Sequence, residues 1–508
     1  MKRAVILAFV TVLAGLATPA LAQSVGSDLI RRAVAAAGGE PALRTLKSVK
    51  IVGETKWWEP DQSVAVGGPP YFAGDTKFSI VWDLVGERAR TSLDRTLPGV
   101  GHVEFEEVVT PRYGFVTDEN GSRPMSGIRV AAQLRELRRI APNLLIRMLD
   151  NLGNTNFEGG VRSAEGIQPG ISFKDGATRF IVIFSKKTRL PAIVRTQDDD
   201  AVRGATNYEV RFDDWRPVAG VQIAHQLTYT VSDAPLGRTL YTRVDVNPAV
   251  DAAQFSPPDQ IKASLKPPAT ENVPYQWVIR QLALGSFLDS DRVFAPEGGS
   301  LKLVQLAPNI QHVVGGSHNN LIVNMNDGVV VFDAPVNDGQ SRWVIDAARK
   351  TYGKPVKQLV LTHHHSDHIA GVRAYMAEGA ALLVPDRKFF IKLALAEHVA
   401  ADGMESRGAA ANITEIKDEM TLSDGTTAIR LIRIPNHHAD GMLIAHIMPA
   451  NVVYVCDLYS PGRDTHKTNG LLSFHDALRR LGIKDAIIAG GHGGSGPQSA
   501  LDAIAGAK

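Results

Sequence analysis

Hydrophobic and polar positions alternate along much of the first half of the chain. Four stretches have an apolar residue at every second position or an unbroken apolar run, which is typical of strands with one or two buried faces. They are residues 78–84, 180–184, 208–212 and 227–231. Between the first two, residues 130–150 carry leucine, isoleucine and methionine at helical spacing. The pattern predicts a mainly antiparallel β domain that contains a helical segment.

The pattern changes toward the C-terminus, where short apolar runs alternate with segments of helical spacing. Strands are expected at residues 303–306, 311–314, 320–324, 329–332 and 356–362. Helices are expected at residues 341–352 and 389–401. This alternation indicates a second domain in which sheets and helices are layered, so the chain as a whole is expected to be α+β.

Paired prolines at positions 257–258 and 267–268 mark a border between the regions with these two sequence patterns. We therefore predict a β domain over residues 23–265, a linker over 266–295 and a second domain over 296–508. A connecting helix is expected at residues 275–288. A chain of 508 residues with 44% hydrophobic and 21% charged residues is ordinary for a globular protein of more than one domain.

The charge of the chain argues against a nucleic-acid partner. The formal net charge is +2, and the first 22 residues contain Lys2 and Arg3 but no acid, so the remainder sums to zero. A protein that binds nucleic acid usually carries a marked excess of basic residues. We expect a small-molecule partner instead; the oligomeric state stays open.

The first 22 residues are typical of a secretory signal peptide. A basic start is followed by an apolar core at residues 4–16 and by small residues at 20–22. A permanent membrane anchor is the alternative, but the apolar run is short for a bilayer and Pro19 follows it. Cys456 is the only cysteine, so no intramolecular disulfide is possible. We expect a periplasmic or secreted bacterial protein with no permanent membrane span after cleavage.

The loop after the strand at 356–362 holds the strongest chemical signal. It reads His363-x-His365-x-Asp367-His368. Positions two apart on a turning backbone point the same way, so His363 and His365 can close on one metal ion while Asp367 and His368 face a neighbouring one. The alternative is a surface histidine run that binds adventitious metal or nothing, but such an ordered pattern is rare by chance.

Further candidate ligands follow later apolar runs. His437 and His438 come after the strand end at 432–434, Asp457 ends the run at 451–456, and His492 ends the run at 486–491. Each of these positions alone is more often a turn or cap residue. Together, and after the histidine cluster, they predict a complete metal centre at one edge of the second domain.

This set of residues resembles the metallo-β-lactamase fold superfamily, over about residues 296–508. The resemblance implies an αββα sandwich and a ligand for each position of a two-metal site. The first metal would be held by His363, His365 and His438, and the second by Asp367, His368 and His492. Asp457 would bridge them. His438 is preferred to His437 because its spacing to Gly441 matches the family, and Asp333 would support the metal loop without ligating.

The resemblance also implies a function. Two Zn²⁺ ions, or Mn²⁺ or Fe²⁺ in their place, would share a hydroxide that attacks an ester, lactone, thioester or amide, with Asp367 and Asp457 as the catalytic carboxylates. A β-lactam is a possible substrate. However, several β-lactamase branches carry cysteine or serine where this chain has Asp457, which favours the broader hydrolase group. An iron-dependent oxidoreductase on the same fold and a non-enzymatic periplasmic binding or carrier protein are the alternatives.

The N-terminal domain carries a more diffuse resemblance. Residues 212–223 are similar to strand-turn-strand stretches in periplasmic lipoprotein-carrier-like domains, whose sheets curve around an apolar cavity. Trp57, Trp58 and Tyr71 could line a ligand mouth there. Aromatic residues on strands more often serve sheet packing, which is the interpretation we favour.

Overall fold

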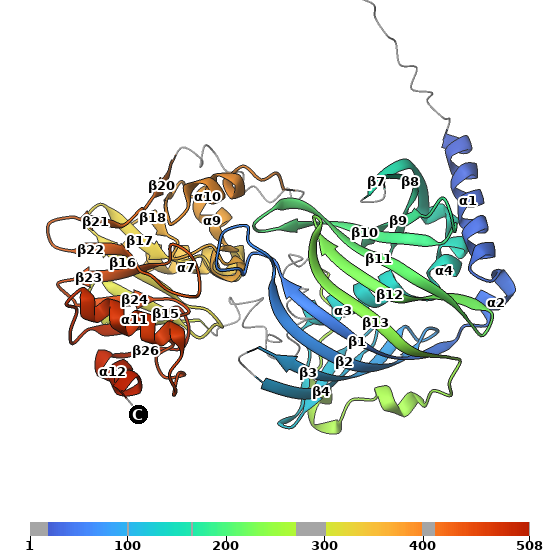
Figure 1. Ribbon diagram of the computed structural model, residues 1–508, viewed down its shortest axis with the longest axis horizontal. Helices are drawn as coiled ribbons and strands as arrows, with labels where there is room; N and C mark the ends of the chain where they lie inside the picture. The colour runs from blue at the N-terminus through green and yellow to red at the C-terminus, as the bar shows by residue number, and fades with distance from the viewer. Residues whose placement is uncertain (1–18, 99–100, 164–165, 271–300, 399–411, 507–508) are drawn as a thin grey trace, which may run out of the picture.

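The computed structural model describes residues 19–506 apart from 99–100, 164–165, 271–300 and 399–411. The chain forms a large antiparallel β domain followed by a layered α/β domain beside it (Figure 1). This arrangement has the predicted α+β class. The predicted connecting helix at 275–288 lies outside the described residues, and the predicted linker largely does so; the domain borders stay predictions.

The N-terminal domain is one thirteen-stranded sheet, in the order β6-β5-β4-β3-β2-β1-β13-β12-β11-β10-β9-β8-β7. Every pairing in the sheet is antiparallel. Each pair joins strands that are neighbours in sequence, except β1 with β13, which joins the two halves of the sheet. The strands are β1 Ser48–Glu59, β2 Tyr71–Asp83, β3 Arg88–Leu97, β4 Gly101–Val109, β5 Gly114–Asp118, β6 Gly121–Pro124, β7 Thr155–Ser163, β8 Gly166–Asp175, β9 Thr178–Phe184, β10 Pro191–Asp200, β11 Gly204–Val218, β12 Val221–Val231 and β13 Ala234–Val246.

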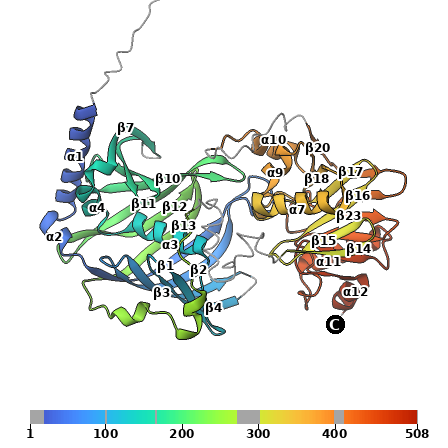
Figure 2. The ribbon, with the colours of Figure 1, turned by 180° about the vertical axis from the view of Figure 1, so that it is seen from behind.

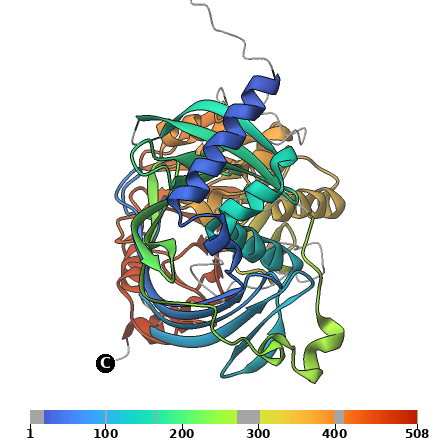
Figure 3. The same ribbon diagram turned by 90° about the vertical axis from the view of Figure 1, so that its right-hand side faces the viewer.

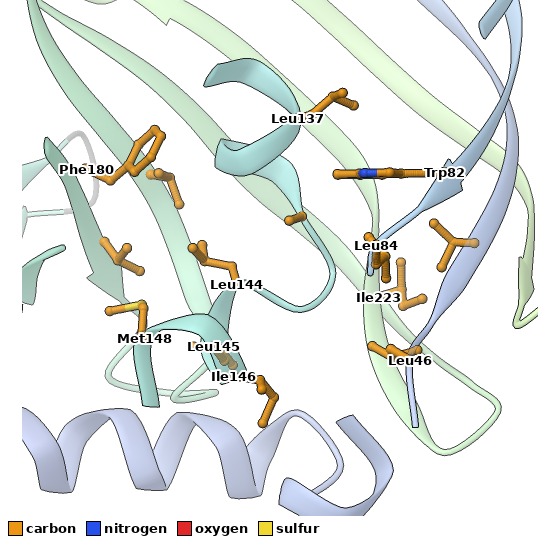
Figure 4. Packing of buried hydrophobic residues seen from close by; sticks show 14 of the residues in the cluster. Leu46, Trp82, Leu84, Leu137, Leu144, Leu145, Ile146, Met148, Phe180 and Ile223 are labelled. Atoms are coloured by element: carbon orange, nitrogen blue, oxygen red, sulfur yellow. The ribbon is translucent and has the colours of Figure 1, made fainter. Parts of the chain in front are cut away.

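Helices fill the concave side of this sheet, which curves around them (Figure 3). The predicted helical segment at 130–150 is two helices, because Ala141 is extended and Pro142 cannot continue the first helix. Figure 4 shows side chains of both helices between Phe180 of β9 and Trp82 of β2, and all of the labelled residues are buried. The helices are α1 Pro19–Ala36, α2 Glu40–Arg44, α3 Gly127–Ile140 and α4 Leu144–Asp150, with short 3-10 helices at Leu152–Asn154, Ala252–Phe255 and Asp259–Ser264.

The three aromatic residues near the end of β1 have different environments. The Trp57 ring lies 5.7 Å from that of Tyr229, and the Trp58 ring lies 6.2 Å from that of Phe72. Tyr71 is 48% exposed. The contacts of the two tryptophans agree with the predicted packing role.

The predicted signal segment lies mostly outside the described residues. Helix α1 begins at Pro19, so the predicted cleavage position after Ala22 falls in its first turn. Export stays a prediction. Within the described part of the chain, no helix combines the length and the apolar character needed to cross a membrane.

The C-terminal domain has two sheets. The first has the order β14-β15-β16-β17-β18-β19-β20 and the second β21-β22-β23-β24-β25-β26. The strands of the first are β14 Lys302–Ala307, β15 Ile310–Val314, β16 Asn320–Met325, β17 Gly328–Phe332, β18 Val356–Val360, β19 Ala381–Val384 and β20 Ile413–Glu415. Those of the second are β21 Glu419–Ser423, β22 Ala428–Arg433, β23 Leu443–Met448, β24 Val452–Val455, β25 Ile487–Gly490 and β26 Ser495–Pro497.

Three buried layers show that helices cover the outer face of each sheet. Along β17, Val329 and Val331 pack with the helices on one side, while Val330 and Phe332 pack against the second sheet. This alternation follows from the two-residue period of a strand, and it explains why a strand buried on both faces is apolar throughout. The helices are α7 Asp338–Tyr352, α8 Ser366–Ile369, α9 Val372–Ala377, α10 Arg387–Ala394, α11 Asn469–Arg480 and α12 Gln498–Gly506. The result is the predicted αββα sandwich.

The two domains meet through an apolar contact. Val336 and Ala370 of the C-terminal domain share a buried cluster with Tyr208 and Leu227 of the large sheet. Seen from behind, α7 and α9 lie on the side of the C-terminal domain that faces this sheet (Figure 2). The contact places the β1–β2 connection, residues 60–70, beside the histidine loop.

Candidate metal centre

The histidine loop leaves the end of β18 and is fixed by a buried carboxylate. Asp333, directly after β17, accepts hydrogen bonds from the backbone nitrogen of Thr362 at 2.8 Å and from its hydroxyl at 3.0 Å. Tyr454 donates its hydroxyl to the other oxygen of Asp333 at 3.2 Å. Burial raises the pKa of Asp333, but its bond with His368 and the Thr362 amide outweigh burial and lower that pKa. Asp333 therefore anchors the loop, which is the supporting position that the family resemblance implied.

One group of side chains gathers the first predicted metal ligands. Ligand atoms of His363, His365, His438 and Asp457 all lie within 4.8 Å of one another. Asn436 accepts hydrogen bonds from the backbone nitrogens of His438 at 2.7 Å and Ala439 at 2.8 Å, which holds the turn after β22. The turn directs His438 into the group and leaves His437 exposed.

A second group gathers the other predicted ligands and one residue that the sequence did not reveal. Asp367, His368 and His492 lie together with His318 from the β15–β16 loop. His318 Nε2 lies 2.9 Å from Asp367 Oδ2, and its Nδ1 lies 2.8 Å from the Ser317 hydroxyl. His318 follows an apolar strand, as the predicted ligands do, but it precedes the histidine cluster, whereas the other separate ligands follow it.

Asp457 lies between the two groups. Its Oδ2 is 3.1 Å from His363 Nε2, 3.1 Å from His368 Nε2 and 2.9 Å from His438 Nε2. Its Oδ1 is 2.6 Å from His492 Nε2. Burial raises the pKa of Asp457, but the surrounding imidazoles, His368 foremost, hold it well below its usual range. One ionised carboxylate thus contacts imidazoles of both groups.

In three of the imidazoles, the ring nitrogen that points away from the group forms a hydrogen bond with another protein atom. This hydrogen bond determines which nitrogen of the ring has its lone pair toward the group. His365 Nε2 donates to the Ser63 carbonyl and His492 Nδ1 to the Ser317 carbonyl, both at 3.0 Å. His363 Nδ1 lies 3.0 Å from the Thr362 hydroxyl, which already donates to Asp333, so the imidazole is the donor. In the neutral form of each ring, the other nitrogen therefore carries the lone pair.

Three nitrogens that face the group, His363 Nε2, His365 Nδ1 and His438 Nε2, are buried without a hydrogen bond in the described part of the chain. Burial lowers the pKa of His363 to about 4 and that of His365 to about 2, so both rings are neutral at pH 7. Orphaned, neutral nitrogen donors beside an ionised carboxylate are the ligands that a divalent transition metal requires. The residues present therefore fit a metal centre.

His368 shows how strongly the cluster favours positive charge. Burial lowers the pKa of this imidazole, but the Asp457 carboxylate outweighs burial and holds the pKa well above its usual range. A site that retains a proton against burial also favours a bound cation, which would take the proton's place.

Cys456 lies beneath the second group and is fully buried. Its Sγ is 3.1 Å from His368 Nδ1, and burial raises the pKa of the thiol well above its usual range. A neutral thiol packed in this way serves as a small core residue. The Gly491 backbone passes directly over it, and a Cβ at position 491 would lie 2.1 Å from Cys456 Sγ.

Gly491→Ala is therefore expected to lower the free energy of unfolding by about 1–3 kcal/mol, the usual cost of overpacking a core. Urea denaturation of the variant and of the wild type measures the difference. Adding Cys456→Ala removes the sulfur and is expected to restore most of the loss. A double variant no more stable than Gly491→Ala alone would show that the sulfur contact is not the cause.

Residues of the N-terminal domain also reach the centre, which the sequence did not predict. Gln62 donates to Asp367 Oδ1 at 2.6 Å, and the Ser63 carbonyl accepts from His364 Nε2 as well as His365 Nε2. The partners are about three hundred positions apart, and no local pattern in the sequence marks such a contact.

Comparisons with known proteins identify the C-terminal domain. Residues 313–492 match the model of the Metallo-beta-lactamase superfamily. A Linear primary-alkylsulfatase of Pseudomonas sp. (strain ATCC 19151) is 39% identical over 57 residues, which are 11% of this chain and 11% of that protein. A Metallo-beta-lactamase type 2 of Bacillus cereus is 27% identical over 96 residues, which are 17% of this chain and 38% of that protein. The chain thus covers only a minor part of each relative's length.

Among solved structures, a metallo-beta-lactamase from Pontibacter korlensis is 16% identical, with a TM-score of 0.32 over 40% of this chain and 97% of that chain. One from Hirschia baltica is 18% identical, with a TM-score of 0.32 over 40% of this chain and 96% of that chain. The family match confirms the resemblance predicted for the C-terminal domain. The resemblance predicted for the N-terminal domain stays a prediction.

Proposed function

We propose that this chain, whose residues 313–492 match the metallo-β-lactamase superfamily, is a dinuclear metal-dependent hydrolase of an ester, lactone, thioester or amide. The observation that carries the proposal is the place of Asp457. Its two carboxylate oxygens contact imidazoles of both groups at 2.6–3.1 Å. A carboxylate shared in this way suits a pair of metal ions rather than a single structural ion, whose site is normally closed.

Each group would hold one ion, with Asp457 between them. The first would be held by His363, His365 and His438, and the second by Asp367, His368 and His492. When bound, two such ions lower the pKa of a shared water from about 15.7 toward about 7 and polarise the scissile carbonyl. No serine or cysteine nucleophile is then needed.

The chain's own residues keep the centre ready for this chemistry. The carbonyls of Ser63 and Ser317 and the hydroxyl of Thr362 fix the imidazole tautomers, so nitrogen lone pairs face inward. Gln62 and His318 hold one oxygen each of Asp367, at 2.6 and 2.9 Å. We propose that Asp367 accepts the proton that the attacking water gives up. Asp457 would set the spacing between the two groups.

Zinc is the metal that we propose for both positions. The donors are imidazole nitrogens and carboxylate oxygens, and the one nearby thiol has a raised pKa that disfavours a thiolate. The same donors also accept Mn²⁺ or Fe²⁺, so the metal that the protein acquires depends partly on supply.

The substrate class follows less directly from the site. The two relatives are, by name, a linear primary-alkylsulfatase and a metallo-beta-lactamase, which points to alkyl sulfate esters and to β-lactams. Either bond is open to attack by an activated water. We propose carboxylic esters, lactones and thioesters first, and include these two bonds among the substrates to be tested.

A substrate panel tests the proposal. Purified full-length protein is assayed with lactones, aryl esters, thioesters, an alkyl sulfate and the β-lactam nitrocefin. We expect turnover of at least one class, its loss after treatment with a chelator, and its recovery when zinc is added back. Turnover that survives complete metal removal, or no hydrolysis by metal-loaded protein across the panel, would contradict the proposed function.

A further inference from the structure

The connection between β1 and β2 leaves the N-terminal domain and contacts the histidine loop of the C-terminal domain (Figure 1). Gln62, near its start, donates its side-chain amide to Asp367 Oδ1 at 2.6 Å and to the Ser366 hydroxyl at 3.2 Å. The backbone carbonyl of the next residue, Ser63, accepts a hydrogen bond from His365 Nε2 at 3.0 Å. These contacts fall on two candidate ligands, one from each metal group.

The connection is held firmly on both sides of the domain border. On the N-terminal side, Arg203 in the β10–β11 turn forms a two-pronged ion pair with the Asp61 carboxylate, with one contact at 3.0 Å. On the C-terminal side, the Asp61 carbonyl accepts from the Ser366 amide at 3.3 Å and the Val64 carbonyl from the Asp440 amide at 2.7 Å. The four residues from Asp61 to Val64 therefore have little freedom to move away from the metal loop.

The ion pair that anchors this segment is largely removed from water. The side chains of Arg203 and Asp61 are 21% and 16% exposed. Burial lowers the pKa of Arg203, but Asp61 and Asp200 outweigh burial and raise it. A bidentate pair in such surroundings holds its partners in one geometry, unlike a solvent-exposed pair.

We propose that residues 61–64 of the N-terminal domain are part of the active site and that Gln62 is a positioning residue for Asp367. This inference rests on the proposed function, because it assigns Gln62 a role only if Asp367 holds a metal ion. A carboxylate with one oxygen held by an amide donor presents its other lone pairs in a fixed direction. Groups that orient metal ligands in this way typically change metal affinity by about 10–100-fold.

A simple docking contact between the domains is the competing explanation. Apolar packing of Val336 and Ala370 against the large sheet already holds the domains together. If Gln62 only added to that docking, its removal would affect stability and leave the metal centre unchanged. The two explanations therefore differ in a measurable way.

Two variants of Gln62 in the full-length protein separate these explanations. Gln62→Ala removes the donor, and Gln62→Glu keeps the shape but places a carboxylate oxygen against Asp367. Gln305→Ala, on the exposed edge strand β14, serves as the matched control. Zinc affinity is measured by competition with a chromophoric chelator, thermal unfolding is followed for each metal-free variant, and kcat and KM are measured with the substrate that the wild type turns over.

We expect Gln62→Ala to weaken zinc binding at the group that contains Asp367 about 10–100-fold and to lower kcat. Gln62→Glu is expected to weaken that binding at least as much. Unfolding temperatures should stay close to that of Gln305→Ala. Zinc affinity and kcat equal to wild type in both variants, in a wild type that binds two zinc ions, would overturn this inference alone. A wild type that binds no metal would overturn the proposed function as well.

Discussion

Replacing Asp457 with asparagine is expected to remove both metal ions and to lower hydrolysis by roughly 1000-fold or more, since water without a metal has a pKa of about 15.7 rather than about 7. Asp457 contacts His363, His368 and His438 through one oxygen and His492 through the other. Asparagine has the same shape but no negative charge, so imidazoles of both groups lose the carboxylate that they share.

Asparagine is the better replacement because of the backbone at this position. Asp457 has a φ of 50°, in the left-handed region that asparagine tolerates and most other side chains avoid. Alanine would add about 1–2 kcal/mol of backbone strain and confuse loss of metal with loss of stability. Elemental analysis and turnover of Asp457→Asn are measured together. Retention of two metal ions per chain would show that Asp457 does not link the groups.

The adjacent histidines of the turn after β22 provide the second large effect and its own control. His438→Ala is expected to release one metal ion and reduce turnover by roughly 100-fold or more, because a zinc left with too few protein ligands binds weakly. His438 Nε2 lies 2.9 Å from Asp457 and has no hydrogen bond within the described chain, whereas His437 is exposed to solvent.

His437→Ala is expected to match the wild type in metal content and turnover. The two variants differ by one position in the same turn, so general effects on folding should be similar. Metal loss in His437→Ala with an unaffected His438→Ala would mean that the turn presents the other imidazole in solution.

The strands and the histidine loop were predictable because they depend on local periodicity. Strand β17 is apolar throughout because both of its faces are buried, and that run is visible in the sequence. The strand-end positions of Asp457 and His492 followed from the same reasoning, since ligands collect where strands of a layered domain end. The structure brings all seven predicted ligands into two adjacent groups.

Contacts that depend on how distant segments dock were not predictable. Gln62 and Asp367 meet only because the apolar faces of two domains pack together, and the sequence pattern carries no information about that docking. The break between α3 and α4 is different, because Pro142 is a helix breaker that is visible in the sequence, although the apolar periodicity continues across it. His318 was likewise visible as a residue following an apolar strand.

The two-metal centre is tested most directly by elemental mass spectrometry of the purified protein. We predict about two zinc ions per chain, removed by a chelator together with hydrolytic activity. A single iron per chain, or a protein that takes up no divalent metal when it is supplied in excess, would contradict it.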